Sequence, residues 1–331
     1  MSSLGRLPAQ ERQRLVRPLL DWLAHAGQHV DCQWGGWRIT PVGGGWSNLL
    51  YRVTNSAHDL AIKFTLRDAR DRAGREYAAL CVLQEAGLAV APEPILLDRT
   101  SYAQPVVVQT WLDGKVSATP PTSDADWRKL VQHFALIHSV TPDNTATRLP
   151  EAVLNANTVL EGRRIVQQQV ARIPRGARPR SLRRLVRQFE RSEFPDWSRA
   201  PVALCRVDNN TLNIIRRPGR WASVDWENAG WGDPAFDVVD WMTHAAYIGV
   251  SPERWDWVVD EYRGLVDDPT ASHRIQVYHK ILLVWWVARL ARYLYEVPRG
   301  LDQRLVAWPD GWQHDMRTKY EHYLGLAEAL L

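Results

Sequence analysis

The hydrophobic pattern of this chain changes character once, close to Gly114. Before that point, short strand-like apolar segments surround a single helical stretch, and after it the spacing of apolar residues is mostly helical. A pattern of this kind predicts an α+β protein in which a small antiparallel sheet precedes a larger helical part. We therefore predict a domain boundary near this glycine, with one unit over residues 1–113 and a second over 114–331.

The first unit is expected to contain a sheet of five strands with one inserted helix. RITPVGGGWSNLLYRV predicts two strands joined by a glycine-rich turn, and LAIKF, PILLD and PVVVQTWL predict the other three. The inserted helix is expected over 68–86, ahead of Gly87, because a glycine commonly follows the last helical residue. A separate amphipathic helix is expected over 10–27.

The second unit is expected to be helical apart from one stretch. Residues 202–226 contain short apolar runs that resemble strands more than helices. Ser123, with Asp126 three residues later, predicts the start of the first helix. The further helical patterns cover about 153–172, 180–193, 236–248, 252–264, 272–296 and 312–330.

The composition excludes several classes of protein. Of the 331 residues, 45% are hydrophobic and 24% are charged, which argues against intrinsic disorder. A formal net charge of +4 is too small to indicate a nucleic-acid or membrane partner. The three cysteines form no C-x-x-C pair, so a disulfide framework and a zinc site are both unexpected, and a cytoplasmic protein fits best. Neither a secretory signal nor a membrane-spanning apolar run is evident.

A glycine-rich turn and a lysine in the first unit suit the binding of phosphate. GGGWSN lets backbone N–H groups approach a polyanion, because glycine has no side chain to block them. Lys63 is the polar residue within LAIKF, and a buried ammonium group there needs a partner. Glu76, on the next expected helix, could supply it. From these residues alone, a structural hairpin, an edge-strand lysine and a surface glutamate also stay possible.

Two later segments contain polar residues at the ends of short apolar runs. In LCRVDNNTLNII, Asp208 could accept a proton from a hydroxyl group and Asn213 could ligate a metal ion, although an Asx-rich turn is an alternative. Asp225 ends a predicted strand, where ligands often bind. Asp233 followed by Pro234 is typical of a helix N-terminus.

The order of these features resembles a known family. A glycine-rich hairpin, a strand lysine, a helix glutamate, D-x-x-x-x-N and a strand-end aspartate form the phosphoryl-transfer set of kinases. With VDWE at 224–227 and GDPAFD at 232–237, residues 40–250 are similar to the aminoglycoside phosphotransferase and choline-kinase-like small-molecule kinases. This resemblance implies a two-lobed protein-kinase-like fold. It also implies transfer of the γ-phosphate of ATP, with Mg²⁺, to a hydroxyl group of a small molecule.

The resemblance further implies a role for each matching residue. Asp208 would orient or deprotonate the acceptor hydroxyl, while Asn213 and Asp225 would hold Mg²⁺. Lys63 would bind the α- and β-phosphates and pair with Glu76. The other implied nucleotide-binding residues are Gly44, Gly45, Ser47 and Asn48 in the hairpin, and Thr110 and Leu112 in a hinge segment.

The catalytic segment departs from the usual family pattern, H-G-D-x-H-P-x-N. Arg206 and Asn210 stand where histidines are usual, and Leu212 stands where a glycine is common. Arg206 could support the loop through hydrogen bonds, but it carries a fixed charge. A catalytically weak, nucleotide-binding pseudokinase is therefore the alternative function. A protein kinase is disfavoured, because VDWE and GDPAFD lie too close together for an activation segment.

The acceptor is the least constrained part of the prediction. Glu227, Asp240 and Trp241 are the candidate acceptor residues, with Glu296 as a further acid, because aromatic walls and a carboxylate suit an amine. A polycationic acceptor would need a broad acidic cleft, which this arginine-rich chain does not suggest. The expected partners are a nucleotide and a small molecule, and the expected assembly is a monomer or a homodimer.

Residues 163–191 offer a third hypothesis. They contain ten arginines and one acidic residue, as an RNA-binding segment would. No aromatic interleaving or RNA-binding motif accompanies them. We therefore favour a solvated helical pair and expect no nucleic-acid partner.

Overall fold

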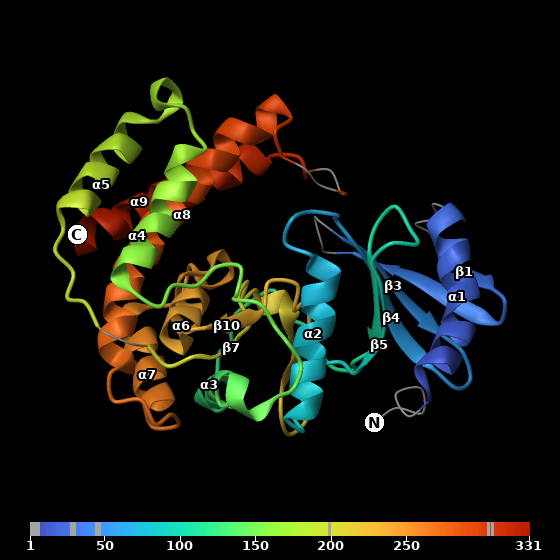
Figure 1. Ribbon diagram of the computed structural model, residues 1–331. Helices are drawn as coiled ribbons and strands as arrows, with labels where there is room; N and C mark the ends of the chain where they lie inside the picture. Colours follow the sequence, from blue (N-terminus) through green and yellow to red (C-terminus); the bar gives the residue numbers. More distant parts are fainter. Residues whose placement is uncertain (1–6, 27–30, 44–47, 198–199, 303–304, 306–307) are drawn as a thin grey trace.

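The computed structural model describes residues 7–26, 31–43, 48–197, 200–302, 305 and 308–331. A part built around a sheet and a part built from helices lie on either side of α2, Arg72–Glu85 (Figure 1). This is the α+β organisation expected from the change of pattern along the chain. No helix in the described ranges is long and apolar enough to cross a bilayer.

The sheet has six strands within the described residues, one more than predicted. All neighbouring strands are antiparallel, in the order β1-β2-β3-β4-β6-β5. The additional strand, β1, has only three residues and is too short to show an alternating pattern. The strands are β1 Cys32–Trp34, β2 Trp37–Val42, β3 Asn48–Thr54, β4 Asp59–Thr65, β5 Pro94–Asp98 and β6 Val106–Thr110.

The two faces of β4 meet different helices. Ile62 and Phe64 pack into an apolar cluster with α1, Ala9–Ala26. Lys63, between them, points to the opposite face because successive side chains of a strand alternate, and there it reaches α2. β4 lies between β3 and β6, so Lys63 is an interior residue of the sheet and only 5% exposed. The edge-strand alternative is therefore excluded.

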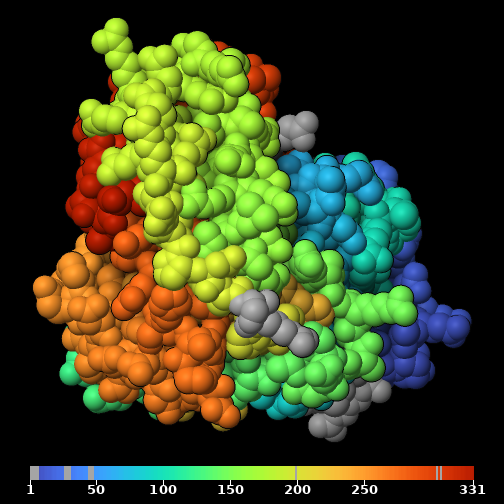
Figure 2. Space-filling model, turned by 60° about the vertical axis from the view of Figure 1, so that its left-hand side comes forward, coloured from blue at the N-terminus to red at the C-terminus, as the bar shows by residue number. Residues whose placement is uncertain are grey.

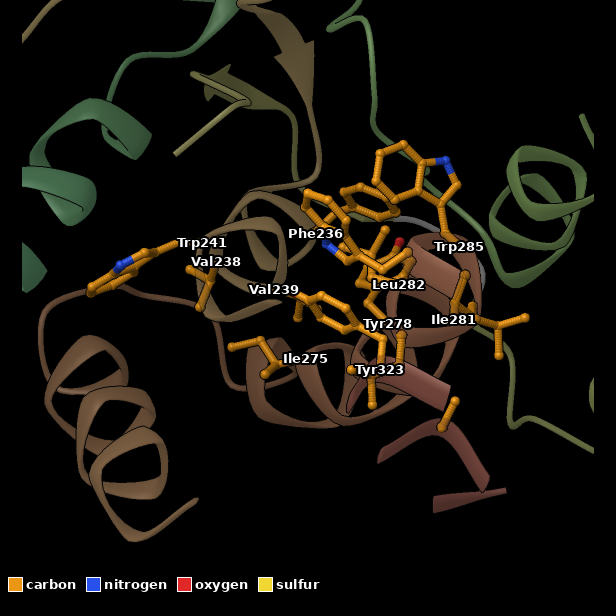
Figure 3. Packing of buried hydrophobic residues seen from close by; sticks show 14 of the residues in the cluster. Phe236, Val238, Val239, Trp241, Ile275, Tyr278, Ile281, Leu282, Trp285 and Tyr323 are labelled. Atoms are coloured by element: carbon orange, nitrogen blue, oxygen red, sulfur yellow. The ribbon is translucent and has the colours of Figure 1, made fainter. Parts of the chain in front are cut away.

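The helical part is organised around α8, Ala271–Glu296. Most residues of this helix are buried, and its middle, Ile281–Ala288, is apolar throughout, which is typical of a helix within a core. It packs against α4, α6 and α9, and Figure 3 shows part of that core, with Phe236 of α6 directed toward Tyr278 of α8. The predicted helices are all present: α3 Asp124–His138, α4 Val159–Ala171, α5 Arg180–Arg191, α6 Pro234–Thr243, α7 Pro252–Arg263 and α9 Trp312–Leu330.

Two short antiparallel ladders interrupt the helices, as the apolar runs in 202–226 predicted. β7, Ala203–Cys205, pairs with β10, Gly230–Gly232, and β8, Ile214–Ile215, pairs with β9, Ala222–Ser223. A Cβ atom on Gly230 would lie 2.3 Å from the backbone N of Ala152, so only glycine fits there. The two ladders hold the loop after β7 close to the segment after β9.

The arginine-rich segment covers the outer surface of the helical part. α5 buries Leu182, Leu185 and Phe189 and exposes its arginines, as an amphipathic helix does. Figure 2 shows α4 and α5, coloured green to yellow-green, across one face of the molecule. Arg184 of α5 pairs with Glu328 of α9, which ties this helix to the C-terminal one.

Candidate active site

Lys63 lies at the centre of a buried group of carboxylates. Its Nζ is 2.8 Å from Glu76 Oε2 and 3.3 Å from Glu227 Oε2, and it also donates to Asp225 Oδ1. Burial alone would lower the pKa of Lys63, but the three acids outweigh it and raise the pKa well above its usual value. The lysine is therefore a fixed cation, and the predicted contact with Glu76 is present.

Glu76 is fully buried on the inner side of α2. Burial raises the pKa of Glu76 to about 7, although the Lys63 ammonium favours the carboxylate. Its Oε1 atom has no hydrogen-bond partner within the described residues. The ion pair with Lys63 is thus the main stabilising contact of this carboxyl group.

Glu227 binds residues of the sheet-containing part. Its Oε2 accepts a hydrogen bond of 2.7 Å from Asn48 Nδ2, and its Oε1 accepts one from Arg72 Nη1. The structure therefore places Glu227 with Lys63, on the side proposed for nucleotide, rather than in an acceptor pocket. Asp225 has a left-handed backbone, with φ 66°, and Glu227 lies in the turn that follows, and both carboxylates reach the same lysine. Arg72 was missed because no motif distinguishes it from the other arginines of its helix.

The Asp208 loop has a strained backbone held by α6. Val207 and Asp208 both have φ 60°, a left-handed conformation that costs a non-glycine residue about 1–3 kcal/mol. Asp237 offsets this cost, because its two carboxylate oxygens accept the backbone N–H groups of Arg206 and Val207, each at 2.9 Å. The first turns of α6 thus position the loop.

Arg206 takes the place of the usual loop histidine and is wholly buried. Its Nη1 donates to the backbone oxygen of Asp208 at 3.0 Å and to Asn209 Oδ1 at 3.1 Å. Its Nη2 donates to the backbone oxygen of Val224 at 2.6 Å. The arginine therefore links the Asp208 loop to the segment that carries Asp225.

The Asp208 carboxylate faces open space on one side and a histidine on the other. Its side chain is 44% exposed, and Oδ1 lies 3.3 Å from His244 Nε2. Burial of the loop would raise the pKa of Asp208, but the hydrogen bond from His244 and the positive charge of Arg206 lower it to about 2. Asp208 is therefore ionised at neutral pH. His244 follows α6 in no recognisable motif, and sequence reasoning missed it.

Asp240 and Trp241 do not lie where an acceptor could reach them. Asp240 is 3% exposed beneath the loop, where Oδ2 accepts from Asp208 N and Asn209 Nδ2, both at 3.0 Å. Burial, aided by Asp237, raises the pKa of Asp240 to about 7. Trp241 is fully buried and stacks on Phe134 with ring centroids 4.3 Å apart. Figure 3 shows its ring on the other side of α6 from Phe236. The acceptor prediction for these two residues does not agree with their burial.

Asn213 and Asp225 offer oxygen atoms that suit a divalent cation. Asn213 Nδ2 donates to the backbone oxygen of Asp208 at 3.2 Å, so its side-chain oxygen is the atom left for a ligand. Val224 N donates to the backbone oxygen of Asn213 at 3.0 Å. Asp225 directly follows Val224, so this hydrogen bond brings Asp225 close to Asn213. Carboxylate and amide oxygens are ligands that Mg²⁺ prefers, so these residues fit the ion.

The remaining predicted nucleotide residues lie at the edge of the sheet or beyond the described ranges. Thr110 ends β6, where its N–H donates to the backbone oxygen of Glu93 at 3.0 Å. Leu112 follows in an irregular segment. Asn48 begins β3. Gly44, Gly45 and Ser47 fall outside the described residues, so the predicted hairpin contacts stay predictions.

Comparison with known proteins connects these features to a family. The Phosphotransferase enzyme family matches residues 38–278. No curated protein matches the chain.

Several solved structures share the fold over nearly the whole chain. A choline/ethanolamine kinase family protein from Mesorhizobium loti matches with a TM-score of 0.62 and 17% identity, covering 98% of this chain and 95% of its own. A Plasmodium vivax ethanolamine kinase gives 0.60 and 13%, with 99% of both chains covered. A spectinomycin phosphotransferase, solved with ADP and spectinomycin, gives 0.60 and 12%, with 96% and 98% covered. These similarities establish the two-lobed kinase-like fold.

Proposed function

Because the chain belongs to the phosphotransferase enzyme family, we propose that it is an ATP-dependent kinase that phosphorylates a hydroxyl group of a small molecule in the cytoplasm. The observation that carries this proposal is the meeting of Lys63, from the sheet, with Asp225, from the segment after β9. A cation beside a candidate metal ligand is the arrangement that phosphoryl transfer requires, because both stabilise phosphate charge. The neighbouring kinases are consistent with this assignment.

In this proposal, residues 1–113 form the nucleotide lobe and residues 114–331 the catalytic and acceptor lobe. The hairpin with Gly44, Gly45, Ser47 and Asn48 would cover the phosphates, and Lys63 would bind them while Glu76 holds its ammonium group. Adenine would lie against the hinge near Thr110 and Leu112. The Thr110 N–H already donates a hydrogen bond to the backbone oxygen of Glu93. The hinge contact would therefore come from the Thr110 carbonyl group and from Leu112.

Asn213 and Asp225 would hold Mg²⁺, which supplies positive charge to the transferred phosphoryl group. Asp208 would accept a hydrogen bond from the acceptor hydroxyl and orient its oxygen toward the γ-phosphate. Its low pKa makes orientation the larger part of this role, because a weak base takes the proton only as the new bond forms. Arg206 and Asp237 keep the carboxylate in place.

The geometry favours this function over a pseudokinase. The loop that lacks the usual histidine is still connected to α6 and to the Asp225 segment, through Arg206 and Asp237. Asp208 is ionised and exposed, as a residue that contacts an acceptor must be. None of the departures from the family pattern removes a residue with a proposed catalytic or metal-binding role.

The test is the substitution Asp208→Asn, measured with a panel of hydroxyl acceptors. Asparagine is nearly isosteric, so nucleotide affinity by calorimetry should be unchanged. Turnover measured by ADP release should fall by roughly 10²–10⁴-fold, because the anionic partner of the acceptor hydroxyl is lost. Wild-type turnover that persists in the variant would exclude Asp208 as the catalytic carboxylate. A wild type that binds nucleotide but releases no ADP with any acceptor would support the pseudokinase.

A further inference from the structure

Every acidic residue that the sequence offered for an amine-binding pocket is already engaged. Glu227 belongs to the Lys63 cluster, and Asp240 lies beneath the Asp208 loop. Glu296 is buried and pairs with Arg172 at 2.9 Å and Arg292 at 3.0 Å. Within the described part of the chain, none of these carboxylates is available to receive a cationic acceptor.

The groups that lead away from Asp208 are instead a histidine, two tryptophans and an arginine. His244 lies 3.3 Å from the Asp208 carboxylate and meets the ring of Trp286 edge-on, with ring centroids 5.9 Å apart. Trp286 in turn meets Trp285 of the same helix, α8, at 5.3 Å. A continuous set of contacts therefore leads from the catalytic loop to this stretch of α8.

Arg289 lies one turn further along that helix. Its guanidinium carbon is 5.0 Å from the ring centroid of Trp285, 6.0 Å from that of Trp286 and 4.9 Å from that of Tyr293. Three aromatic rings thus hold the guanidinium group, which lowers the entropy that it would lose on binding a ligand.

The charge of Arg289 is not neutralised locally. Its side chain is partly exposed, and within the described residues no carboxylate lies within 4.0 Å of it. Arg292 on the same helix, by contrast, is paired with Glu296 and with Gln169. Trp286 contacts both Arg289 and His244, so its ring connects this guanidinium group to the residue that contacts the Asp208 carboxylate.

We propose that the acceptor is a hydroxy acid, whose carboxylate binds Arg289 while its hydroxyl group reaches Asp208. The inference rests on the proposed kinase function and adds the charge class of its acceptor. A guanidinium group presents two parallel N–H donors that match a carboxylate, and an amine in the same position would be repelled by Arg289.

Two sets of acceptors that differ only in charge test the proposal. Gluconate, sorbitol and glucamine share one carbon skeleton, and lactate, 1,2-propanediol and 1-amino-2-propanol share another. ADP release gives kcat/KM for each compound, and calorimetry with a non-hydrolysable ATP analogue gives its affinity. In at least one of the two sets, we expect the carboxylate compound to give the highest kcat/KM and the highest affinity.

Variants of Arg289 sharpen the measurement. Arg289→Gln should lower kcat/KM for the preferred carboxylate by roughly 10- to 100-fold, because a charged hydrogen bond is lost, with KM for ATP unchanged. Arg289→Glu should shift the preference toward the amine of the same set. Arg299→Gln is the matched control, because Arg299 also stacks on a tyrosine, Tyr295, at 4.2 Å, but is exposed in the turn that follows α8.

Two results would overturn the inference and leave the kinase proposal standing. One is a preference for the amine over the carboxylate. The other is an Arg289→Gln variant whose kinetics with the carboxylate are unaltered. If none of these six compounds is turned over, the wider acceptor panel still tests the kinase proposal, and calorimetry decides the inference. Carboxylate binding that Arg289→Gln abolishes supports it, and the absence of carboxylate binding overturns it.

Discussion

His244 donates a hydrogen bond through Nε2 to Oδ1 of Asp208, across 3.3 Å. The direction of the bond follows from the other ring nitrogen, since His244 Nδ1 accepts from the backbone N–H of Ala246 at 3.2 Å. In the neutral ring the proton must then be on Nε2. One carboxylate oxygen of Asp208 is thereby fixed, and in the proposed function the other would contact the acceptor.

Replacing His244 should therefore impair turnover more than nucleotide binding. We expect His244→Ala to lower kcat by about 10-fold or more, the cost of one hydrogen bond to a charged group, with KM for ATP unchanged. His244→Gln should recover much of the activity, because its amide can donate the same bond. Steady-state kinetics for the two variants checks this, with the exposed His314→Ala as control. Equal losses for the alanine and glutamine variants would contradict a positioning role.

Removing Lys63 should affect both nucleotide binding and stability. Lys63→Ala should raise KM for ATP and lower kcat, because the phosphates lose their fixed cation. It should also destabilise the nucleotide-free protein by about 3 kcal/mol, since buried carboxylates are left without a partner.

The Lys63→Ala destabilisation should be larger at pH 8 than at pH 6. Without the ammonium, Glu76 can relieve its burial only by binding a proton, which is easier at low pH. Chemical denaturation at the two pH values measures the difference. Lys319→Ala, which removes an exposed pair with Asp315, should change stability little at either pH. A pH-independent loss in Lys63→Ala would count against this account.

Magnesium dependence tests the oxygen ligands. Asn213→Ala should raise the Mg²⁺ concentration for half-maximal activity by roughly 10-fold, because one protein ligand of a weakly held ion is lost. Saturating Mg²⁺ should restore much of kcat. A Mg²⁺ titration of ADP release measures this, with Asn55→Ala in a turn of the sheet as control. An unchanged Mg²⁺ requirement would exclude Asn213 as a ligand.

The raised pKa of Asp240 predicts that the stability of the folded protein depends on pH. Its pKa is raised from an unfolded value of about 3.9 to about 7, so between these values the folded state binds one more proton than the unfolded state. This group therefore lowers stability as pH rises from 4 to 7. Asp240→Asn keeps the acceptor oxygen and removes the charge. Its melting temperature relative to wild type should increase between pH 5 and pH 8, and a constant difference across that range would be evidence against the raised pKa.

Parts of the site could be predicted because they depend on local sequence. Asp233 accepts the N–H of Ala235 at 2.9 Å at the start of α6, as an aspartate before a proline should. The Lys63–Glu76 pair could also be expected, because a strand and the helix that follows it usually pack together.

Other parts depend on contacts between distant segments. Glu227 meets Arg72 and Asn48 across 155 and 179 residues of sequence, and no local pattern indicates such a meeting. Trp241 was predicted to line an acceptor pocket because aromatic walls suit an amine, and its position in α6 gives no indication of the direction of its ring. Nearly every side chain of α6 is buried, so the helix has no polar face to mark the core side.

The cluster around Lys63 also bears on the order in which ligands arrive. Lys63 and Arg72 contribute two positive charges, and Glu76, Asp225 and Glu227 contribute three negative ones when all are ionised, so the group then has a net charge of −1. A bare triphosphate would meet repulsion there, and it would have to displace Asp225 from the ammonium it already binds. A triphosphate that carries its own divalent cation meets Asp225 as an attractive ligand instead. In the proposed function, the resting arrangement would therefore favour entry of nucleotide and metal together over entry of a bare polyanion.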